Sequence, residues 1–391
     1  MGTAARPPRT AEVVVVGGGL LGVSATYHLA VSGMRPILLE SHTPGAGASG
    51  RSAGMLVPGF AVPYQYAIAL LGHHAARELY TWTIENVDLV RALVDRERID
   101  CELSTGGVLT LGLGQAQCDV GRTLAAALRA DGFDVQVVER DDLDVLVGTP
   151  AAADIGGGLF QPVAGSVDPA RLVAGLAAAA GRHGAHLVGG VAVRSITAAN
   201  GRIELETGAG PVSCASAVIA LNAWTSELVP ELGRIIAPAR AQMLAYAPTE
   251  PVFRVPVTAA VSDHGEYWRQ AGSGEIVVGG RRDLDHSSAT TAQVTTADVQ
   301  CGVEQILPAL FPQLRLPPVQ ARWAGAMATT PDGLPVAGSV PGVTGAWFAG
   351  GCNGHGLAFA ASLGRVLAEA VIEGRAPAAL SHFDPARPSL G

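Results

Sequence analysis

The residues with the clearest chemical meaning are three glycines and one acid near the N-terminus. Gly17, Gly19 and Gly22 follow the apolar run at 13–16, and Glu40 ends the next apolar run. This is the order strand, G-x-G-x-x-G, helix, strand, acid. Gly17 permits the turn out of the strand, Gly19 lets backbone approach a pyrophosphate, and Gly22 lets the helix pack on the strand. The acid can accept hydrogen bonds from ribose hydroxyls, so the segment predicts a dinucleotide site.

The turn after the first apolar run must lead into a helix that begins at about Leu20. A helix start offers free N–H groups and the positive end of its dipole to an anion. We therefore expect Leu20, Leu21 and Ser41, which follows the acid, beside the dinucleotide. A glycine-rich turn without a ligand is the alternative, because the chain holds 50 glycines.

The next segment favours FAD over a nicotinamide cofactor. Residues 45–56 are mostly small or hydroxylated, include one arginine and follow the acid strand. Such a loop lets backbone pass close to a flat ring system and its diphosphate. A flexible surface loop is the alternative interpretation. The expected cofactor contacts in this loop are Ser49, Arg51, Ser52, Ala53, Gly54 and Met55.

A second glycine-rich segment lies near the C-terminus. An apolar strand within residues 344–359 is followed by several glycines and by an Ala- and Leu-rich helix that extends to about Glu373. A reduced flavin carries negative charge at its N1–C2=O edge, which a helix N-terminus can stabilise. The expected contacts here are Asn353, Gly354, His355, Gly356 and Leu357.

Together these segments resemble the D-amino-acid-oxidase-type FAD oxidoreductases, the group that includes glycine oxidase, sarcosine oxidase and gamma-glutamylputrescine oxidase. The resemblance covers nearly the whole chain and is specific for the superfamily rather than for a substrate. Its motifs are GGGLLG with Glu40, GASGRSAGM at 47–55, AVIALNAW at 217–224, PARAQML at 238–244, EYWRQ at 266–270, TPDGLPVAG at 330–338 and GGCNGHG at 350–356.

The resemblance implies an α/β fold: a Rossmann-like FAD-binding domain interleaved with an α+β domain that carries an antiparallel substrate sheet. It implies non-covalent FAD and an amine or amino acid that is oxidised to an imine by hydride transfer to flavin N5. Oxygen or another electron acceptor completes the cycle. The matching positions add Val193, Asn222 and Trp224 to the expected cofactor contacts.

Three residues are candidates for the substrate side of the flavin. Tyr267 matches a substrate-facing tyrosine of the family, although it also fits a half-buried strand tyrosine. Arg281 follows Gly280 at the end of a strand, where it faces either the cavity or, as a hairpin arginine, the solvent. His355 lies inside the flavin motif, and we expect it to shape the flavin contact rather than to act as a base.

Two departures from the family bear on the substrate. Met327 and Ala358 stand where family members place an arginine or a lysine that holds the substrate carboxylate. This favours an amine without an α-carboxylate, unless another arginine, such as Arg281, binds the carboxylate from a different direction. The chain has no lysine, so a Schiff-base lysine and the lysine that activates oxygen in sarcosine oxidase-like enzymes are both excluded. A dehydrogenase with a non-oxygen acceptor and a non-catalytic flavin-binding protein remain alternatives.

The bulk composition indicates a globular enzyme. Of 391 residues, 48% are hydrophobic and 15% charged, and the net charge of −8 gives no reason to expect a nucleic-acid partner. The five cysteines lack a C-x-x-C pair, which argues for a reducing compartment and against a metal site. We expect no signal peptide, no transmembrane segment and a cytoplasmic location.

The order of these segments predicts two interleaved domains. The FAD-binding domain is expected at 10–85, 166–224 and 331–380, and the substrate domain at 86–165 and 225–330. Residues 1–9 and 381–391 are expected to be tails. Strands are expected at 108–113, 241–246, 259–262 and 276–280, because several of these runs alternate apolar and polar residues.

Overall fold

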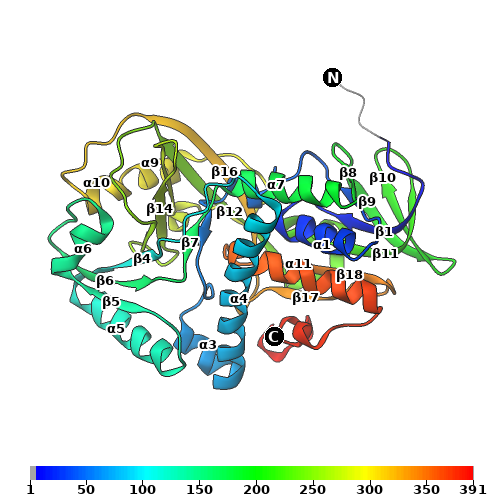
Figure 1. The fold of residues 1–391 in the computed structure, drawn as a ribbon, viewed down its shortest axis with the longest axis horizontal. Helices are drawn as coiled ribbons and strands as arrows, with labels where there is room; N and C mark the ends of the chain where they lie inside the picture. The colour runs from blue at the N-terminus through cyan, green and yellow to red at the C-terminus, as the bar shows by residue number, and fades with distance from the viewer. Residues whose placement is uncertain (1–5, 391) are drawn as a thin grey trace.

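A computed structural model describes residues 6–390, and these fold around two large sheets (Figure 1). The first five residues of the expected N-terminal tail lie outside this range. The first sheet has the order β17-β18-β11-β1-β2-β8, with the hairpin of β9 and β10 attached to β11. Its strands are β1 (Thr10–Val16), β2 (Ile37–Leu39), β8 (His186–Val188), β9 (Val193–Ala199), β10 (Arg202–Thr207), β11 (Val212–Ile219), β17 (Val336–Ser339) and β18 (Ala346–Gly350).

The middle of this sheet is parallel and buried on both faces. Val13 and Val15 point into one apolar cluster, whereas Val14 and Val16 point into another. Continuous apolar runs are typical of parallel strands covered on both sides. The helices that contribute to the first cluster include α1 (Leu20–Val31), α4 (His73–Glu97), α7 (Pro169–Arg182) and α11 (Gly356–Glu373).

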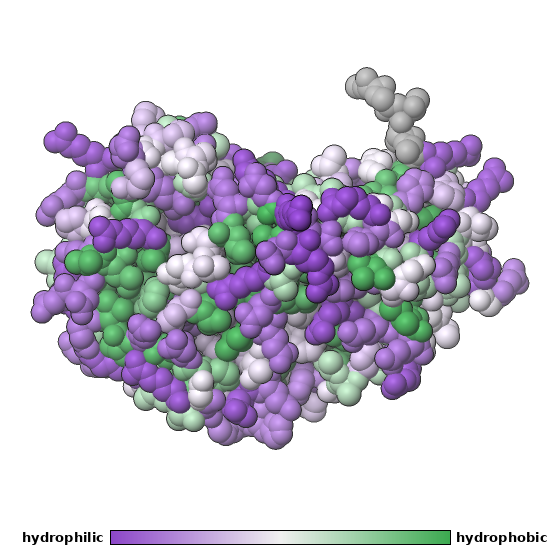
Figure 2. Space-filling view, viewed as in Figure 1, coloured by the Kyte–Doolittle hydropathy of each residue, from purple (hydrophilic) through white to green (hydrophobic). Residues whose placement is uncertain are grey.

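The second sheet has the order β16-β12-β15-β14-β13-β4-β6-β5. Helices α5 (Gly114–Ala130), α6 (Arg140–Val147), α9 (Ala297–Glu304) and α10 (Ile306–Leu310) belong to the same half, drawn at the left in Figure 1. A shallow dip on the upper edge of the space-filling view lies between the two halves (Figure 2). The strands are β4 (Val108–Leu113), β5 (Gln136–Glu139), β6 (Ile155–Gln161), β12 (Ala237–Tyr246), β13 (Val257–Ala259), β14 (Glu266–Gln270), β15 (Ile276–Gly279) and β16 (Val319–Thr329).

This sheet differs from the expected antiparallel sheet at one place, because β13 pairs with β4 in parallel. The sheet joins two separate chain segments there, and no hairpin fixes the direction of that pair. Strand β13 also ends at Ala259, before the expected end at Ser262. The reason is local: the Glu266 carboxylate accepts the N–H groups of Val261 (2.7 Å) and Ser262 (3.1 Å), which takes them out of the ladder.

Shorter elements connect the halves: α2 (Ala48–Arg51), β3 (Met55–Leu56), α3 (Tyr64–Leu71), β7 (Gly165–Ser166) and α8 (Thr225–Leu228). Strand β3 pairs with β7. The expected domain boundary between residues 85 and 86 falls inside α4, which continues to Glu97 and stands between the two halves in Figure 1.

The segment after residue 380 is packed against the protein and is not the expected tail. Phe383 is fully buried. The Arg387 guanidinium donates to both carboxylate oxygens of Asp332, with Nε–Oδ2 and Nη2–Oδ1 distances of 2.6 and 2.8 Å. Ser389 donates to the same carboxylate. The C-terminal segment is thereby fixed to the turn that precedes β17.

Candidate functional site

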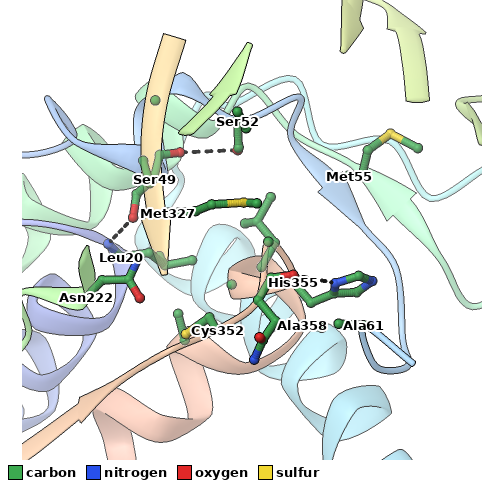
Figure 3. Close-up of a pocket in the computed structure, with 18 of the residues that line it drawn as sticks. Leu20, Ser49, Ser52, Met55, Ala61, Asn222, Met327, Cys352, His355 and Ala358 are labelled. Atoms are coloured by element: carbon green, nitrogen blue, oxygen red, sulfur yellow. Dashed lines mark hydrogen bonds between the residues drawn. The ribbon is translucent and has the colours of Figure 1, made fainter. Parts of the chain in front are cut away.

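A cavity of about 1590 Å³ is lined by residues from both halves. It extends from the start of α1 to the strands of the second sheet, and Figure 3 shows the part near the start of α11. Its walls include both glycine-rich segments that the sequence singled out. The cavity therefore places the N-terminal and C-terminal motifs in one site.

The three N-terminal glycines serve different purposes in the structure. A Cβ atom on Gly17 would lie 2.5 Å from the Ala220 carbonyl oxygen, and one on Gly22 would lie 2.0 Å from the Gly17 oxygen. These two glycines allow close packing of turn, strand and helix. A Cβ on Gly19 would meet only the Ser49 Oγ, at 3.1 Å. Gly19 thus leaves open space beside the α1 N-terminus, as a bound pyrophosphate requires.

Glu40 lies at the cavity wall and is held by its neighbours. One carboxylate oxygen accepts the Gly18 N–H at 2.7 Å. The other accepts the His42 N–H at 2.8 Å and the Ser41 hydroxyl at 3.1 Å. The acid is therefore fixed next to the glycine turn, with Ser41 beside it on the cavity surface.

The loop that contains α2 is fastened to the start of α1 and to the second sheet. Ser49 Oγ accepts the Leu20 N–H at 2.9 Å, and the Ser52 hydroxyl donates to the Ser49 carbonyl (Figure 3). Arg51 donates to the carbonyls of Ala46 (2.8 Å) and Ala324 (3.2 Å). Its guanidinium makes no ion pair with a carboxylate of residues 6–390 and lines the cavity. It can therefore meet an anionic ligand.

Two asparagines shape the backbone at the start of α11. Asn353 has a φ of 52°, and its side chain bonds to the N–H and hydroxyl of Thr330. Asn222 has a φ of 47° and accepts the Gly351 N–H at 3.1 Å. These bonds fix the turn that carries His355. Burial lowers the pKa of His355, so its imidazole is neutral at physiological pH.

Most of the cofactor contacts expected from the sequence line this cavity, and so do Tyr267 and His355. Gly22 and Gly54 do not. Gly22 packs α1 on the first strand, and a Cβ on Gly54 would lie 1.9 Å from the Val167 oxygen, so Gly54 serves the contact between β3 and β7. The lining residues among those expected are Gly17, Gly19, Leu20, Leu21, Glu40, Ser41, Ser49, Arg51, Ser52, Ala53, Met55, Val193, Asn222, Trp224, Asn353, Gly354, His355, Gly356 and Leu357.

Arg281 requires a correction, because the neighbouring arginine faces the cavity in its place. The Arg281 guanidinium pairs with Asp283 at 3.1 Å and is not part of the cavity wall. Arg281 has a left-handed φ of 54°, which breaks the alternation that follows from β15. Arg282, which the sequence analysis did not select, consequently lines the cavity.

The Arg282 guanidinium has no carboxylate partner among residues 6–390. Its Nη2 donates to His264 Nδ1 at 3.0 Å, and its Nη1 lies 3.9 Å from Met327 Sδ. Burial lowers the pKa of Arg282, yet arginine remains charged at any physiological pH. A partly buried cation of this kind favours an anionic ligand in the cavity.

Tyr267 lies in the middle of the second sheet, opposite Gly279 on β15 and Thr258 on β13. A Cβ at position 279 would lie 2.4 Å from the Tyr267 ring, so the glycine makes room for it. Burial raises the pKa of Tyr267 to about 12, which keeps the phenol protonated. The hydroxyl makes no hydrogen bond within residues 6–390 and can donate to a ligand.

Cys352 also borders the cavity, and burial raises the pKa of its thiol to about 12. The thiol is thus an unreactive neighbour of the site. Among residues 6–390, no cluster of His, Cys, Asp or Glu is arranged to hold a metal ion. No helix in the described part of the chain is long and apolar enough to cross a membrane.

Comparison with known proteins shows the family to which the chain belongs. Residues 12–370 match the model of the DAO family, described as FAD dependent oxidoreductase. The chain is 27% identical to the probable oxidoreductase OrdL of Haemophilus influenzae, over 94% of this chain and 85% of that protein. It is 27% identical to the gamma-glutamylputrescine oxidoreductase of Escherichia coli, over 92% and 83% respectively.

The fold is also shared with a solved structure. The crystal structure of glycine oxidase from Geobacillus kaustophilus superposes with a TM-score of 0.78 at 24% identity, over 98% of this chain and 99% of that one. With the family match over most of its length, the chain belongs to the DAO family of FAD-dependent oxidoreductases.

Proposed function

We propose that the protein oxidises the C–N bond of an amino acid, or of another amine that carries a carboxylate, to the imine. The observation that carries this proposal is the pair formed by Tyr267 and Arg282. Both side chains face the cavity, and neither has a carboxylate partner within residues 6–390. A phenol donor and a guanidinium can together bind a carboxylate.

The cavity also fits FAD. The open space at Gly19 and the start of α1 suit the diphosphate, the Glu40 carboxylate suits ribose hydroxyls, and the start of α11 suits the ring. When bound, FAD supplies a flavin N5 that accepts hydride from the carbon next to the amine nitrogen. The protein's own task is to hold that carbon in position and to exclude water.

The position of Arg282 relative to the flavin motif supports its role. Met327 Sδ lies 3.9 Å from Arg282 Nη1, and it would lie 3.3 Å from a Cβ on Gly354. Only one side chain therefore separates the guanidinium from the start of α11. Figure 3 shows Met327, His355 and Ala358 around this part of the cavity. Met327 and Ala358 favoured a substrate without a carboxylate. We now propose a carboxylate-bearing substrate instead, because Arg282 supplies a cation beside Met327.

Neither His355 nor Tyr267 serves as a strong base at the substrate. His355 is neutral, its Nδ1 lies 3.3 Å from the Asn353 carbonyl, and Tyr267 keeps its proton. We therefore propose that the amine binds in its unprotonated form. The arginine and the tyrosine then orient the substrate, and they are not required to remove a proton.

The test is anaerobic reduction of the flavin, followed by bleaching of its visible absorption. Glycine, sarcosine, D-alanine and proline are compared with methylamine and dimethylamine. We expect reduction by carboxylate-bearing substrates, and a half-saturating concentration roughly 10- to 100-fold higher in Arg282→Met, because a charge-assisted hydrogen bond is lost. Arg281→Met is the matched control, since Arg281 lies off the cavity. Equal reduction by the simple amines, with Arg282→Met unaffected, would refute the proposal.

The electron acceptor is tested in the same preparation. The strand segment around Val277 and Val278 carries no lysine that could activate oxygen. We therefore propose a dehydrogenase with a non-oxygen acceptor as the second candidate. Rapid reoxidation of the reduced protein in air, measured by return of the flavin absorption, would favour the oxidase instead.

A further inference from the structure

One stripe of α5 faces the cavity. Val120, Leu124 and Leu128 follow one another at helical spacing and all line it. The exposed fraction falls from 68% at Val120 to 1% at Leu128, so the stripe leads from the surface into the interior. A helix normally buries such a stripe against other side chains. Here Leu128, at the inner end, is packed in the apolar core, whereas Leu124 is only partly buried and Val120 is exposed, so the outer part of the stripe is left facing the cavity.

The floor below this stripe is a row of residues across the second sheet. Tyr267 is paired with Thr258, Thr258 with Thr110, and Thr110 with Leu159, on four neighbouring strands. Residues paired in this way share one face of a sheet. All four line the cavity. The row therefore connects the Tyr267 hydroxyl with the space under α5.

The polar groups around this space are already bonded to the protein. The two threonine hydroxyls of the row bond to each other at 2.8 Å. Tyr64 donates to Asp131 at 2.6 Å, and Tyr80 accepts from Gln161 at 2.9 Å. Pairing of these groups leaves methyl, methylene and aromatic surface toward the cavity. Tyr267 and Arg282 differ from these groups, because they have no carboxylate partner within residues 6–390 and can bind a ligand.

We propose that the substrate carries an apolar chain that extends from the reacting carbon or nitrogen into the space between the α5 stripe and this row. The proposal rests on the proposed function for the polar end, where Arg282 and Tyr267 hold the carboxylate. The substrate class is then an amino acid with a long apolar side chain or N-alkyl group, rather than one of the size of glycine. The apolar chain is recognised by burial alone, since the bordering polar groups are paired.

The test uses ligands that cannot be oxidised, so it does not depend on turnover. Straight-chain carboxylates from acetate to octanoate are titrated into the FAD-loaded protein, and binding is followed by the change in flavin absorption. Burial of each methylene predicts a dissociation constant about fourfold lower for each added carbon, until the space is filled. A dissociation constant that does not depend on chain length would overturn the proposal. The same result is expected if the space is only an access channel to the flavin, so that alternative would also count against the proposal.

Two variants sharpen this experiment. Leu124→Trp fills the space, and we expect it to abolish the dependence on chain length while acetate affinity changes by less than about twofold. Ala126→Trp is the matched control on the same helix, because Ala126 is exposed and does not line the cavity. Retained flavin absorption shows that each variant is folded. A chain-length dependence in Leu124→Trp equal to that of the wild type would contradict the proposal.

Failure of the proposed function gives a different result. N-alkylglycines and straight-chain 2-amino acids of matched length are added anaerobically to the same protein. If carboxylate affinity rises with chain length but none of these amines bleaches the flavin, the proposed oxidation is wrong and the apolar site stands. If the short N-alkylglycines and 2-amino acids bleach the flavin and chain length has no effect on either measurement, the function stands and the apolar site is wrong.

Discussion

Replacing Gly19 and Gly22 by alanine, one at a time, tests cofactor binding and protein packing separately, although the two glycines lie close together in the sequence. Gly22 lies inside α1, where alanine is normally favoured over glycine by about 1 kcal/mol. At this position the added carbon would lie 2.0 Å from the Gly17 oxygen. Movement of Gly17 is restricted, because its N–H bonds to the Leu39 oxygen at 2.9 Å and the Ala220 carbonyl oxygen lies 2.5 Å from where a Cβ of Gly17 would be. Overpacking of this kind costs about 1–3 kcal/mol or more, so the clash outweighs the helix preference.

Gly19→Ala has the opposite profile. Its φ of −73° and ψ of 175° suit any residue, and the nearest atom to the added carbon is Ser49 Oγ at 3.1 Å. The stability of the apoprotein should change by less than about 0.5 kcal/mol. The methyl group would, however, occupy the space proposed for the pyrophosphate. Loss of one charge-assisted hydrogen bond, worth about 1.5–3 kcal/mol, weakens FAD binding by at least about tenfold.

The assay measures the Tm of each apoprotein and the dissociation constant for FAD from quenching of FAD fluorescence. Gly121→Ala is the matched control, since Gly121 lies in α5 and a Cβ there meets nothing within 4 Å. We expect a lower Tm for Gly22→Ala, a normal Tm with weak FAD binding for Gly19→Ala, and neither change for Gly121→Ala. Wild-type FAD affinity in Gly19→Ala would refute the assignment of the diphosphate site.

Three further predictions follow from other parts of the structure. Acid precipitation should release all of the FAD into the supernatant, because burial keeps the Cys352 thiol protonated; flavin in the pellet would show a covalent link. Burial opposes ionisation of Glu97, but bonds from Tyr27, His183 and Arg182 lower its pKa to about 2. The stabilising effect of Glu97 is therefore full above about pH 4.5 and is lost toward pH 2, so the difference in urea midpoint between wild type and Glu97→Gln should shrink as the pH falls; a constant difference would contradict this. Arg387→Ala should lower the Tm, because it leaves the Asp332 carboxylate buried without its guanidinium partner. Breaking a buried ion pair in this way usually lowers the free energy of unfolding by about 3–5 kcal/mol; an unchanged Tm would show that this ion pair does not stabilise the protein.

Several elements around the candidate cofactor site could be predicted because glycines and apolar runs mark their boundaries directly. The start of α1 at Leu20, the strand at 108–113 and the end of α11 at Glu373 all agree with the sequence analysis. Each is bounded by glycines or by a change in periodicity. The ends of such helices and strands can be predicted because neighbouring residues in the sequence determine them.

The substrate side could be predicted less well, for identifiable physical reasons. The position after Gly280 at the end of a strand pointed to Arg281, but Arg281 itself is left-handed, which is uncommon outside glycine, and the following side chain, Arg282, lines the cavity instead. The parallel pairing of β13 with β4 joins segments about 150 positions apart, and no local pattern encodes it. The docking of Arg387 on Asp332 is likewise a long-range ion pair that periodicity does not reveal.

The order of strands in the first sheet has a consequence for how the protein acquires its cofactor during synthesis. Strand β1 is made before its neighbour β11, and β18 with α11 follow later still. A ribosome-bound chain that has not yet released α11 has only the part of the cavity beside α1, which we propose for the diphosphate. FAD should therefore bind tightly only after α11 has left the ribosome. Cofactor supply would then act on the chain once α11 has folded, stabilising it by about 2.7 kcal/mol when free FAD is 100 times its dissociation constant.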